Sequence, residues 1–217
     1  MSPESLAPPA PPEAAEVFGR SLDVATAYAE LLAGPGVERG LIGPREVDRL
    51  WERHLLNSAA VSAAVPDGAS VLDIGSGAGL PGLPLALVRE DLDVTLVEPL
   101  LRRSTFLTEV CERLGMASVA VRRARAEQLP AQSTEVVVAR AVAPLETLLG
   151  WTMPLLRPGG RLVAMKGRSA ESELSAALPV LRRLQARTWD VRDLPLPGEL
   201  EATRAVVVVA GDSRRHR

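Results

Sequence analysis

The residues best suited to bind a small ligand lie in the segment VLDIGSGAGLPGLPLAL, which predicts a buried strand, a glycine-rich turn and the start of a helix. Asp73 is followed by Gly75, Gly77 and Gly79 at steps of two residues. Successive glycines let the backbone approach a ligand closely, and an aspartate here can accept N–H bonds from the turn. The residues expected to bind a nucleoside ligand in this turn are Asp73, Gly75, Ser76, Gly77, Gly79 and Leu80.

The letters from Gly77 to Gly82 also match G-x-G-x-x-G, the dinucleotide fingerprint, so the register must decide between two classes of ligand. In that fingerprint the first glycine follows directly on the strand, and the next helix points its N-terminus at a pyrophosphate. Here the strand is expected to end at Ile74 and Gly75 follows, which places Leu80 where a small residue would be needed. The spacing therefore favours an adenosine ligand without a phosphate.

A second acidic residue, Glu98, ends the next predicted strand in the segment VTLVEP. A carboxylate at this place can accept hydrogen bonds from both ribose hydroxyls. Because both hydroxyls must then be free, NADP is disfavoured, whereas NAD and S-adenosylmethionine remain. A turn that serves only packing and a hydride-transfer enzyme stay open as alternatives, but Asp73, the spaced glycines and Glu98 together favour S-adenosylmethionine.

The elements that must position these residues alternate between short apolar runs and amphipathic helices, which is typical of an α/β fold with a mostly parallel sheet. The predicted strands are 70–74, 93–98, 118–122, 135–139, 160–166, 188–193 and 205–210. The loop between the last two is too short for a helical crossover, so we expect them to pair antiparallel. Two helices precede the sheet, one from about Pro12 to Ala33, where GPGVERGLIGP breaks it, and one that starts at Pro44.

The length of 217 residues predicts about one domain with an N-terminal helical addition. We expect a disordered tail at 1–12, N-terminal helices packed on the core at 13–66, the α/β domain at 67–211 and a basic tail at 212–217. No apolar run is long enough to span a membrane and no secretory signal precedes the helices, which predicts a cytoplasmic protein without membrane contact.

Charge and cysteine content exclude several classes of protein. A single cysteine, Cys111, excludes internal disulfides and a cysteine-rich metal site, and we expect no metal. The net charge of −2 excludes a protein that coats nucleic acid through bulk charge. Any RNA partner must therefore meet a local basic patch.

Several separate motifs resemble one family when they are taken together. In chain order they are RHLLNS, DIGSGAGLPGLPLAL, LVEPLLRRSTFL, RARAEQL, VVARAVAPL and MKG. With these motifs the chain resembles the small-subunit ribosomal RNA methyltransferase G family, also called glucose-inhibited division protein B. The resemblance implies a class I S-adenosylmethionine-dependent methyltransferase fold, Rossmann-like, with a seven-stranded sheet whose last strand is antiparallel. It also implies methyl transfer to N7 of one guanine in 16S ribosomal RNA, with that RNA or the small ribosomal subunit as partner of a monomeric enzyme.

The residues after the fourth predicted strand allow a test of the implied reaction. Enzymes that methylate exocyclic amines of adenine typically have Asn-Pro-Pro-aromatic there, whereas this chain has Ala-Arg-Ala-Val at 139–142. Carbon methylation of pyrimidines needs a cysteine nucleophile, and Cys111 lies in a helical pattern away from the expected ligand edge. Guanine N7 has an in-plane lone pair at neutral pH, so its methylation needs positioning and no general base. The lack of an obvious acid–base pair is consistent with that reaction.

Arg140 is the predicted catalytic residue, because it ends the fourth strand at the edge where such sheets bind ligands. In the resembled family this arginine lies at the cofactor and acceptor site. Its forked donors could bind the methionine carboxylate, a phosphate or guanine O6, and a surface ion pair is the alternative. Ala126 and Glu127 follow the third strand, where the family holds adenine, although Glu127 also suits a helix N-terminus.

The RNA contacts expected from the resemblance and from the positions of basic residues are Arg53, His54, Asn57, Ser58, Arg123 and Lys166. A packed histidine is the alternative for His54, and ordinary solvation at a strand end is the alternative for Lys166. Arg53 and Asn57 could contact RNA or brace the glycine turn. The family often has Asp where Asn57 stands, which argues against a role that needs a charge there.

A local basic patch could be formed by Arg102, Arg103, Arg122, Arg123 and Arg125, with the terminal RRHR as an arm. Two other functions stay open on the sequence. One is a methyltransferase for a small molecule or a protein side chain. The other is a non-catalytic factor in ribosome assembly that binds an adenosine ligand.

Overall fold

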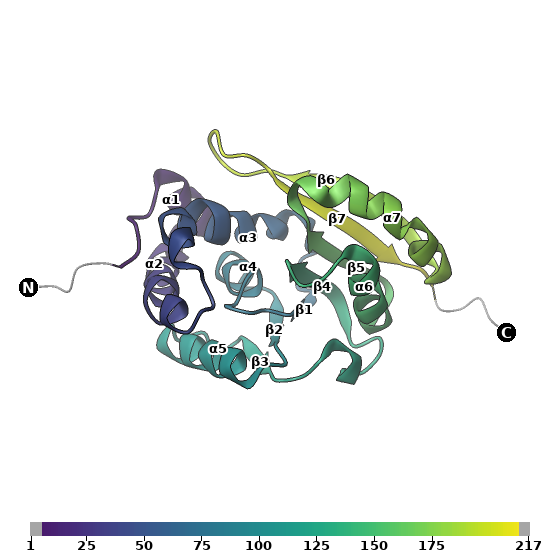
Figure 1. Ribbon diagram of the computed structural model, residues 1–217, viewed down its shortest axis with the longest axis horizontal. Helices are drawn as coiled ribbons and strands as arrows, with labels where there is room; N and C mark the ends of the chain where they lie inside the picture. Colours follow the sequence, from purple (N-terminus) through teal and green to yellow (C-terminus); the bar gives the residue numbers. More distant parts are fainter. Residues whose placement is uncertain (1–5, 213–217) are drawn as a thin grey trace, which may run out of the picture.

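A computed structural model describes residues 6–212, in which one seven-stranded sheet is covered by helices on both faces (Figure 1). The strands lie in the order β3-β2-β1-β4-β5-β7-β6. Their bounds are β1 Ser70–Ile74, β2 Asp93–Val97, β3 Ala120–Arg122, β4 Thr134–Arg140, β5 Leu156–Met165, β6 Ala186–Leu194 and β7 Thr203–Ala210. Every pairing from β3 to β5 is parallel, whereas β7 runs antiparallel to both β5 and β6. The predicted fold and the antiparallel last pair are therefore confirmed.

The central strands are apolar on both faces because both faces are covered. Along β4, Val136 and Val138 join the core beneath the N-terminal helices, while Val137 and Ala139 join the core beneath the helices that follow the strand. This alternation explains why β4 has a continuous apolar run in the sequence instead of a polar–apolar pattern. Strand β5 begins earlier than predicted, because Leu156 already pairs with Thr134 before a shift in register.

The helices divide between the two faces of the sheet. The N-terminal helices share one core with α4 Gly82–Val88 and α5 Leu101–Arg113. The opposite face is covered by α6 Leu145–Thr152 and α7 Ala170–Arg183. Short helical turns complete the chain at η6 Ala126–Gln128, η7 Met153–Leu155 and η8 Gly167–Ser169. None of the helices within residues 6–212 is long and apolar enough to cross a membrane.

The N-terminal addition is a run of helical segments that pack on the sheet. They are α1 Pro12–Phe18, η1 Gly19–Ser21, α2 Leu22–Leu31, η2 Leu32–Gly36, η3 Pro44–Arg49, η4 Leu50–Leu56, α3 Asn57–Ala59 and η5 Ala60–Ala64. Pro44 begins the second group, as predicted. The first group continues beyond its predicted end at Ala33, because a wider π-helical turn accommodates Pro35.

The predicted disorder of residues 1–12 does not hold for residues 6–12. The amide of Leu6 donates to Glu30 Oε2 at 3.0 Å, Ala7 is buried, and the Trp51 indole donates to the carbonyl of Pro8 at 2.9 Å. The partner side chains, Glu30 and Trp51, come from other helices, so the composition of the segment could not indicate these contacts. Residues 1–5 of the predicted tail lie outside the described residues.

The carboxyl ends of β1, β2, β4 and β5 meet at one edge of the sheet, and β7 begins at this edge because it runs the other way. Strand β7 therefore ends, at Ala210, at the opposite edge of the sheet. Of the predicted basic tail at 212–217, residues 213–217 lie outside the described residues. The carboxyl edge is where the candidate site must be sought.

Candidate active site

The glycine turn joins β1 to α4 at the carboxyl edge of the sheet. Gly75, Gly77 and Gly79 have φ values of +71°, +59° and +105°, a region that residues with a Cβ rarely adopt. A Cβ on Gly79 would also lie 2.9 Å from the hydroxyl oxygen of Tyr28. The turn is closed by hydrogen bonds from the amides of Gly79 and Leu80 to the carbonyl of Ser76, at 2.7 and 3.0 Å. Alternate glycines are thus required by the shape of this turn.

Asp73 lies in β1, directly before the turn, and is completely buried. Its Oδ2 accepts a hydrogen bond from the amide of Gly82, the first residue of α4, at 3.0 Å. Its Oδ1 has no hydrogen-bond partner among the described residues. Burial raises the pKa of Asp73 to about 7. A buried carboxylate oxygen without a partner favours a bound ligand that supplies a donor or a positive charge.

Glu98 follows β2 and faces the same turn with 2% of its surface exposed. Its Oε2 accepts from the amide of Gly77 at 3.1 Å, and its Oε1 accepts from the amide of Leu100 at 3.0 Å. The Arg103 guanidinium lies 4.0 Å from Oε2. Glu98 is therefore placed where the sequence predicted it, beside the turn, and its contact with ribose stays a prediction.

The two carboxylates argue against a pyrophosphate at this turn. A dinucleotide phosphate would need the free amides of the turn and of the helix start. Glu98 and Asp73 already accept the hydrogen bonds of Gly77 and Gly82 there, and both carboxylates would repel a phosphate. The same arrangement suits a cationic nucleoside ligand.

Tyr28 is a residue of the site that the sequence analysis missed. It lies on α2, is completely buried, and its hydroxyl donates to the carbonyl of Ala78 at 2.8 Å, across 50 residues of chain. Burial, and next the nearby Asp73, raise the pKa of Tyr28, so the hydroxyl keeps its proton and donates. The available signal was that Tyr28 is the single tyrosine of the sequence. Nothing in its helical spacing distinguishes it from a core aromatic residue.

Arg140 ends β4 but directs its guanidinium toward the N-terminal helices. It donates to Ser58 Oγ at 2.9 Å, to the carbonyl of Arg53 at 2.8 Å and to the carbonyl of His54 at 3.3 Å. Burial, and then the charge of Arg53, lower the pKa of Arg140 to about 10, so it is still charged at neutral pH. The structure thus brings together Arg140, Arg53, His54 and Ser58, and it joins them to one another instead of exposing them separately.

His54 is held between Arg140 and Glu46. Its Nδ1 lies 3.1 Å from Arg140 Nη2, and its Nε2 lies 3.0 Å from Glu46 Oε2. Because a guanidinium can only donate, Nδ1 must accept and the ring proton belongs on Nε2. Burial, and then the charge of Arg140, lower the pKa of His54, which agrees with a neutral ring. The geometry matches the alternative of a packed histidine, here with two partners.

Two more predicted residues contact the protein itself. Asn57 accepts hydrogen bonds from the Thr203 hydroxyl at Oδ1, 2.6 Å away, and at its carbonyl, 3.2 Å away, so it braces the start of β7 and not the glycine turn. The Lys166 side chain is 8% exposed, and its ammonium lies 2.7 Å from Glu173 Oε2 and 2.5 Å from the carbonyl of Ala143. Their contacts with RNA stay predictions, and their present contacts hold the groove in shape.

A segment at residues 141–144, which we term the strap, covers the glycine turn. A Cβ on Gly75 would lie 2.8 Å from Cγ2 of Val142, so the strap and the turn are in close contact. Ala141 has φ of +53°, which is unfavourable for a residue with a side chain. Lys166 and Glu173 fix the strap and the start of α6, because they bond the carbonyl of Ala143 and the amide of Leu145.

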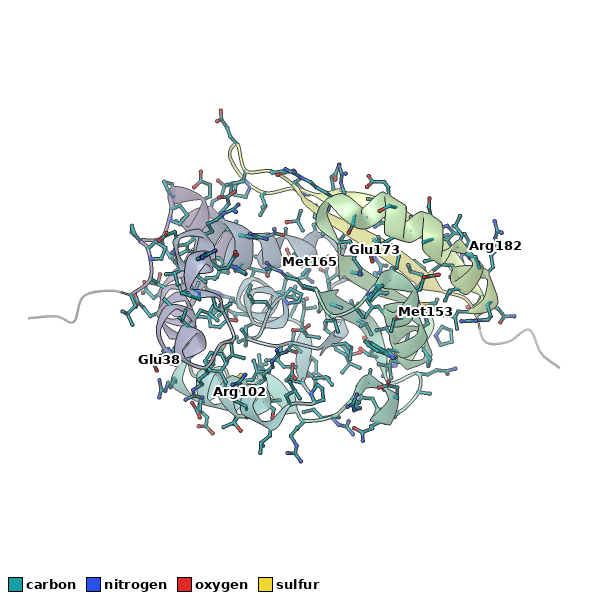
Figure 2. All side chains as sticks on the ribbon, in the orientation of Figure 1. Glu38, Arg102, Met153, Met165, Glu173 and Arg182 are labelled. Atoms are coloured by element: carbon teal, nitrogen blue, oxygen red, sulfur yellow. The ribbon has the colours of Figure 1, made fainter. Side chains whose placement is uncertain are left out.

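A groove of about 1230 Å³ opens beside the strap. Its walls are the N-terminal helices, the strap, η8 and the start of β7, and in Figure 2 Met165 and Glu173 mark the part of it formed by β5 and α7. Arg140 lines the groove as well as bonding the helices. Through the strap the groove adjoins the glycine turn at the carboxyl edge of the sheet.

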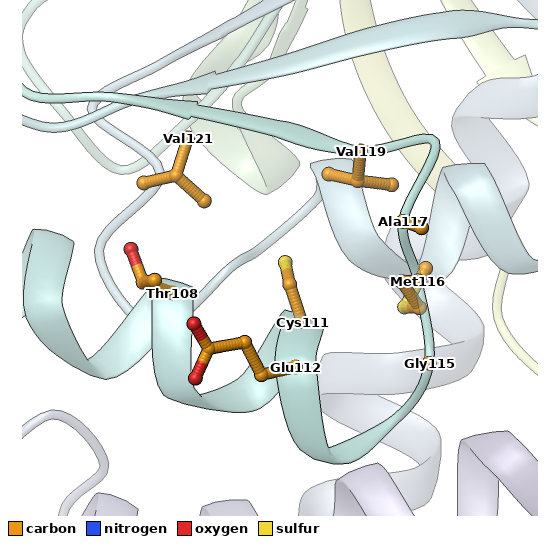
Figure 3. A pocket seen from close by; sticks show the side chains of 8 residues that line it. All are labelled: Thr108, Cys111, Glu112, Gly115, Met116, Ala117, Val119 and Val121. Carbon is orange, nitrogen blue, oxygen red and sulfur yellow. The ribbon is translucent and has the colours of Figure 1, made fainter.

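The remaining candidates follow β3 or lie further away. Ala126 is buried, and Glu127 and Arg123 are exposed after the strand end. Cys111 is buried in α5, and burial raises the pKa of its thiol to about 11. It lines a pocket of about 360 Å³ between α5 and β3 (Figure 3), and no residue of the glycine turn lines this pocket. Within residues 6–212 no cluster of three acidic, histidine or cysteine side chains could hold a metal.

Comparison with known proteins assigns the chain to a family. A family model described as rRNA small subunit methyltransferase G matches residues 21–194. The chain belongs to this family. A ribosomal RNA small subunit methyltransferase G from Streptomyces avermitilis is 61% identical over 181 residues, which cover 82% of this chain and 76% of the relative. One from a Nocardioides species is 53% identical over 210 residues, covering 96% and 84%.

Solved structures of lower identity share the fold of this methyltransferase G family member. A predicted O-methyltransferase from Agrobacterium tumefaciens has a TM-score of 0.59 at 19% identity, covering 72% of this chain and 81% of that one. An S-adenosylmethionine-dependent methyltransferase from Aquifex aeolicus has a TM-score of 0.58 at 16% identity, covering 81% and 97%. The resemblance drawn from the motifs is thereby confirmed for both family and fold.

Proposed function

We propose that this chain transfers a methyl group from S-adenosylmethionine to N7 of a guanine in 16S ribosomal RNA. The observation that carries the proposal is the pair of buried carboxylates, Asp73 and Glu98, which occupy the amides of a glycine turn in a member of the methyltransferase G family. The unpartnered Oδ1 of Asp73 fits a cationic ligand of this kind.

Residues on three strand ends would hold the cofactor. They are Asp73, Gly75, Ser76, Gly77, Gly79, Leu80, Glu98, Ala126 and Glu127. S-adenosylmethionine supplies an electrophilic methyl group on a sulfonium centre when it is bound. Glu98, and Asp73 when it is ionised, would stabilise the positive charge of the cofactor, and their hydrogen bonds with the amides of Gly77 and Gly82 hold the backbone of the turn in place.

Positioning is the main contribution of the acceptor side. Guanine N7 carries its own lone pair, so the chain needs no general base, but it must direct the base in line with the methyl group. Arg140 holds the N-terminal helices against the strand that leads into the strap, and we assign it a positioning role at the catalytic edge. Arg53, His54, Asn57, Ser58, Arg123 and Lys166 remain the proposed RNA side, either by contact or by shaping the groove.

The partner would be 16S ribosomal RNA or the small ribosomal subunit, and we propose that the reaction takes place in the cytoplasm. We further propose that the enzyme acts as a monomer, which light scattering at working concentration would test.

Purified protein incubated with unmethylated 16S RNA or small subunits provides the test. We expect one 7-methylguanosine in the RNA, found by mass analysis of nuclease fragments, and one S-adenosylhomocysteine for each methyl transferred. Transfer only to free small molecules or proteins would overturn the RNA assignment. Cofactor binding without any S-adenosylhomocysteine would instead indicate a non-catalytic factor.

A further inference from the structure

Half of the charged side chains that line the groove form ion pairs within the protein. Lys166 pairs with Glu173, Arg53 pairs with Glu46, and Arg204 pairs with Glu171 and Asp193. Because these charges are compensated, they contribute little attraction toward a polyanion that enters the groove. The charges that remain on its rim must decide where an RNA backbone binds.

Two arginines on that rim have no such partner. Arg49 ends η3 in the N-terminal addition and Arg168 lies in η8 after β5, and both are exposed and line the groove. Neither makes an ion pair or a side-chain hydrogen bond with the described residues. The nearby carboxylate of Glu46 is already bonded to Arg53 and His54. The hydrogen bond with His54 lowers the pKa of Glu46 most, and the charge of Arg49 makes a smaller contribution in the same direction.

We propose that Arg49 and Arg168 bind RNA phosphates on either side of the acceptor nucleotide. This assignment rests on the proposed function and names the surface that binds the RNA substrate. The groove of about 1230 Å³ exceeds the usual range for a small-molecule pocket and has room for a nucleotide with its backbone. Guanidinium groups suit this role because their forked donors match phosphate oxygens.

Two acidic residues on the same rim allow a test of the direction in which charge changes RNA affinity. Glu52 and Glu201 line the groove and form no ion pair with the described residues. A phosphate backbone that follows Arg49 and Arg168 must pass near these carboxylates, which repel it. Removing a carboxylate should therefore change RNA affinity in the direction opposite to removing an arginine.

The competing surface is the basic patch beside β3, formed by Arg102, Arg122, Arg123 and Arg125. These four side chains are exposed, whereas Arg103 faces Glu98. In Figure 2, Arg102 lies well apart from Met165 of the groove. The two surfaces can thus be tested by separate substitutions.

The experiment measures binding of full-length protein to unmethylated small subunits at several salt concentrations, with cofactor affinity and thermal unfolding measured in parallel. We expect Arg49→Gln and Arg168→Gln each to weaken RNA binding about three- to tenfold and to reduce the salt slope by about 1. Cofactor affinity should be unchanged. Arg182→Gln is the matched control, because Arg182 is exposed at the last turn of α7 and lies away from the groove (Figure 2). Glu52→Gln should strengthen binding.

Wild-type methyl transfer to small subunits is measured first. Its absence overturns the proposed function, and this assignment with it. If the wild type methylates the subunit but Arg49→Gln and Arg168→Gln bind as tightly as Arg182→Gln, only the assignment is overturned. The same holds if Arg123→Gln weakens binding and the two groove variants do not.

Discussion

The guanidinium of Arg140 and the hydroxyl of Ser58 lie 2.9 Å apart, although 82 residues of chain separate them. Through this contact the end of β4 is bonded to the N-terminal helices, and the same guanidinium also bonds the carbonyls of Arg53 and His54. The N-terminal addition is therefore part of the edge of the sheet that carries the candidate site. Substitutions of Arg140, Tyr28, Asp73 and His54 test what each of these side chains contributes.

Arg140→Ala should destabilise the protein and slow methyl transfer together. The substitution leaves the carbonyl of Arg53 and the hydroxyl of Ser58 without their charged donor, and we expect a loss of about 2–3 kcal/mol in the free energy of unfolding. Arg140→Lys keeps the charge but lacks the forked donors of a guanidinium, so it cannot bond all of these acceptors and an intermediate loss is expected. Urea denaturation measures this loss. A change in stability below about 0.5 kcal/mol for Arg140→Ala would contradict the bracing role.

Tyr28→Phe should weaken cofactor binding, because it removes the hydrogen bond to Ala78 while the buried ring stays in place. We expect a loss of about 1 kcal/mol in stability and a severalfold increase in the cofactor Kd, measured by calorimetry. Thr152→Val is the matched control, since Thr152 donates to Leu148 within α6 at 2.8 Å and is equally buried. It should lower stability alone. Equal cofactor affinities for the two variants would remove Tyr28 from the site.

Asp73→Asn should stabilise the free protein above pH 7 while weakening cofactor binding. The folded pKa of about 7 lies above the usual value for aspartate, so the contribution of Asp73 to stability is present below about pH 4 and is lost as the pH rises through 7. The neutral amide avoids this loss, and we expect a gain of about 1–3 kcal/mol at pH 8. Urea denaturation at pH 5 and pH 8 gives the comparison. Equal stability of the two proteins at both pH values would show that burial does not raise the pKa of Asp73 in the folded protein.

His54→Asn should change how stability depends on pH. The pKa of His54 is lowered in the folded state, so the unfolded chain takes up the proton first and the free energy of unfolding falls as the pH drops below about 6.5. Asn keeps an acceptor near the position of Nδ1 but does not titrate. The difference in stability between wild type and variant, measured from pH 5 to 7.5, should therefore shrink toward acid pH. A constant difference would mean that His54 is protonated equally in both states.

The sheet and the ligand turn could be predicted because their signals are local. Apolar runs such as that of β4 mark buried strands, and the glycine spacing after Asp73 marks a turn whose backbone angles only glycine adopts easily. Glu98 could be placed beside that turn because consecutive parallel strands end at the same edge. These features depend on chain geometry over a few residues, so the sequence by itself determined them.

Only the tertiary structure decided which partners the charged and polar side chains have. Position in the sequence placed Arg140 and Lys166 at the catalytic edge, but their donors turn to the N-terminal helices and to Glu173. The sequence does not distinguish Tyr28 from other core aromatic residues, whereas the structure shows its hydrogen bond to the carbonyl of Ala78. Periodicity specifies which face of an element is buried, whereas a hydrogen-bond partner tens of residues away depends on how separate elements pack. The glycine turn could therefore be predicted from the sequence, whereas the groove beside it is formed only when separate elements pack together.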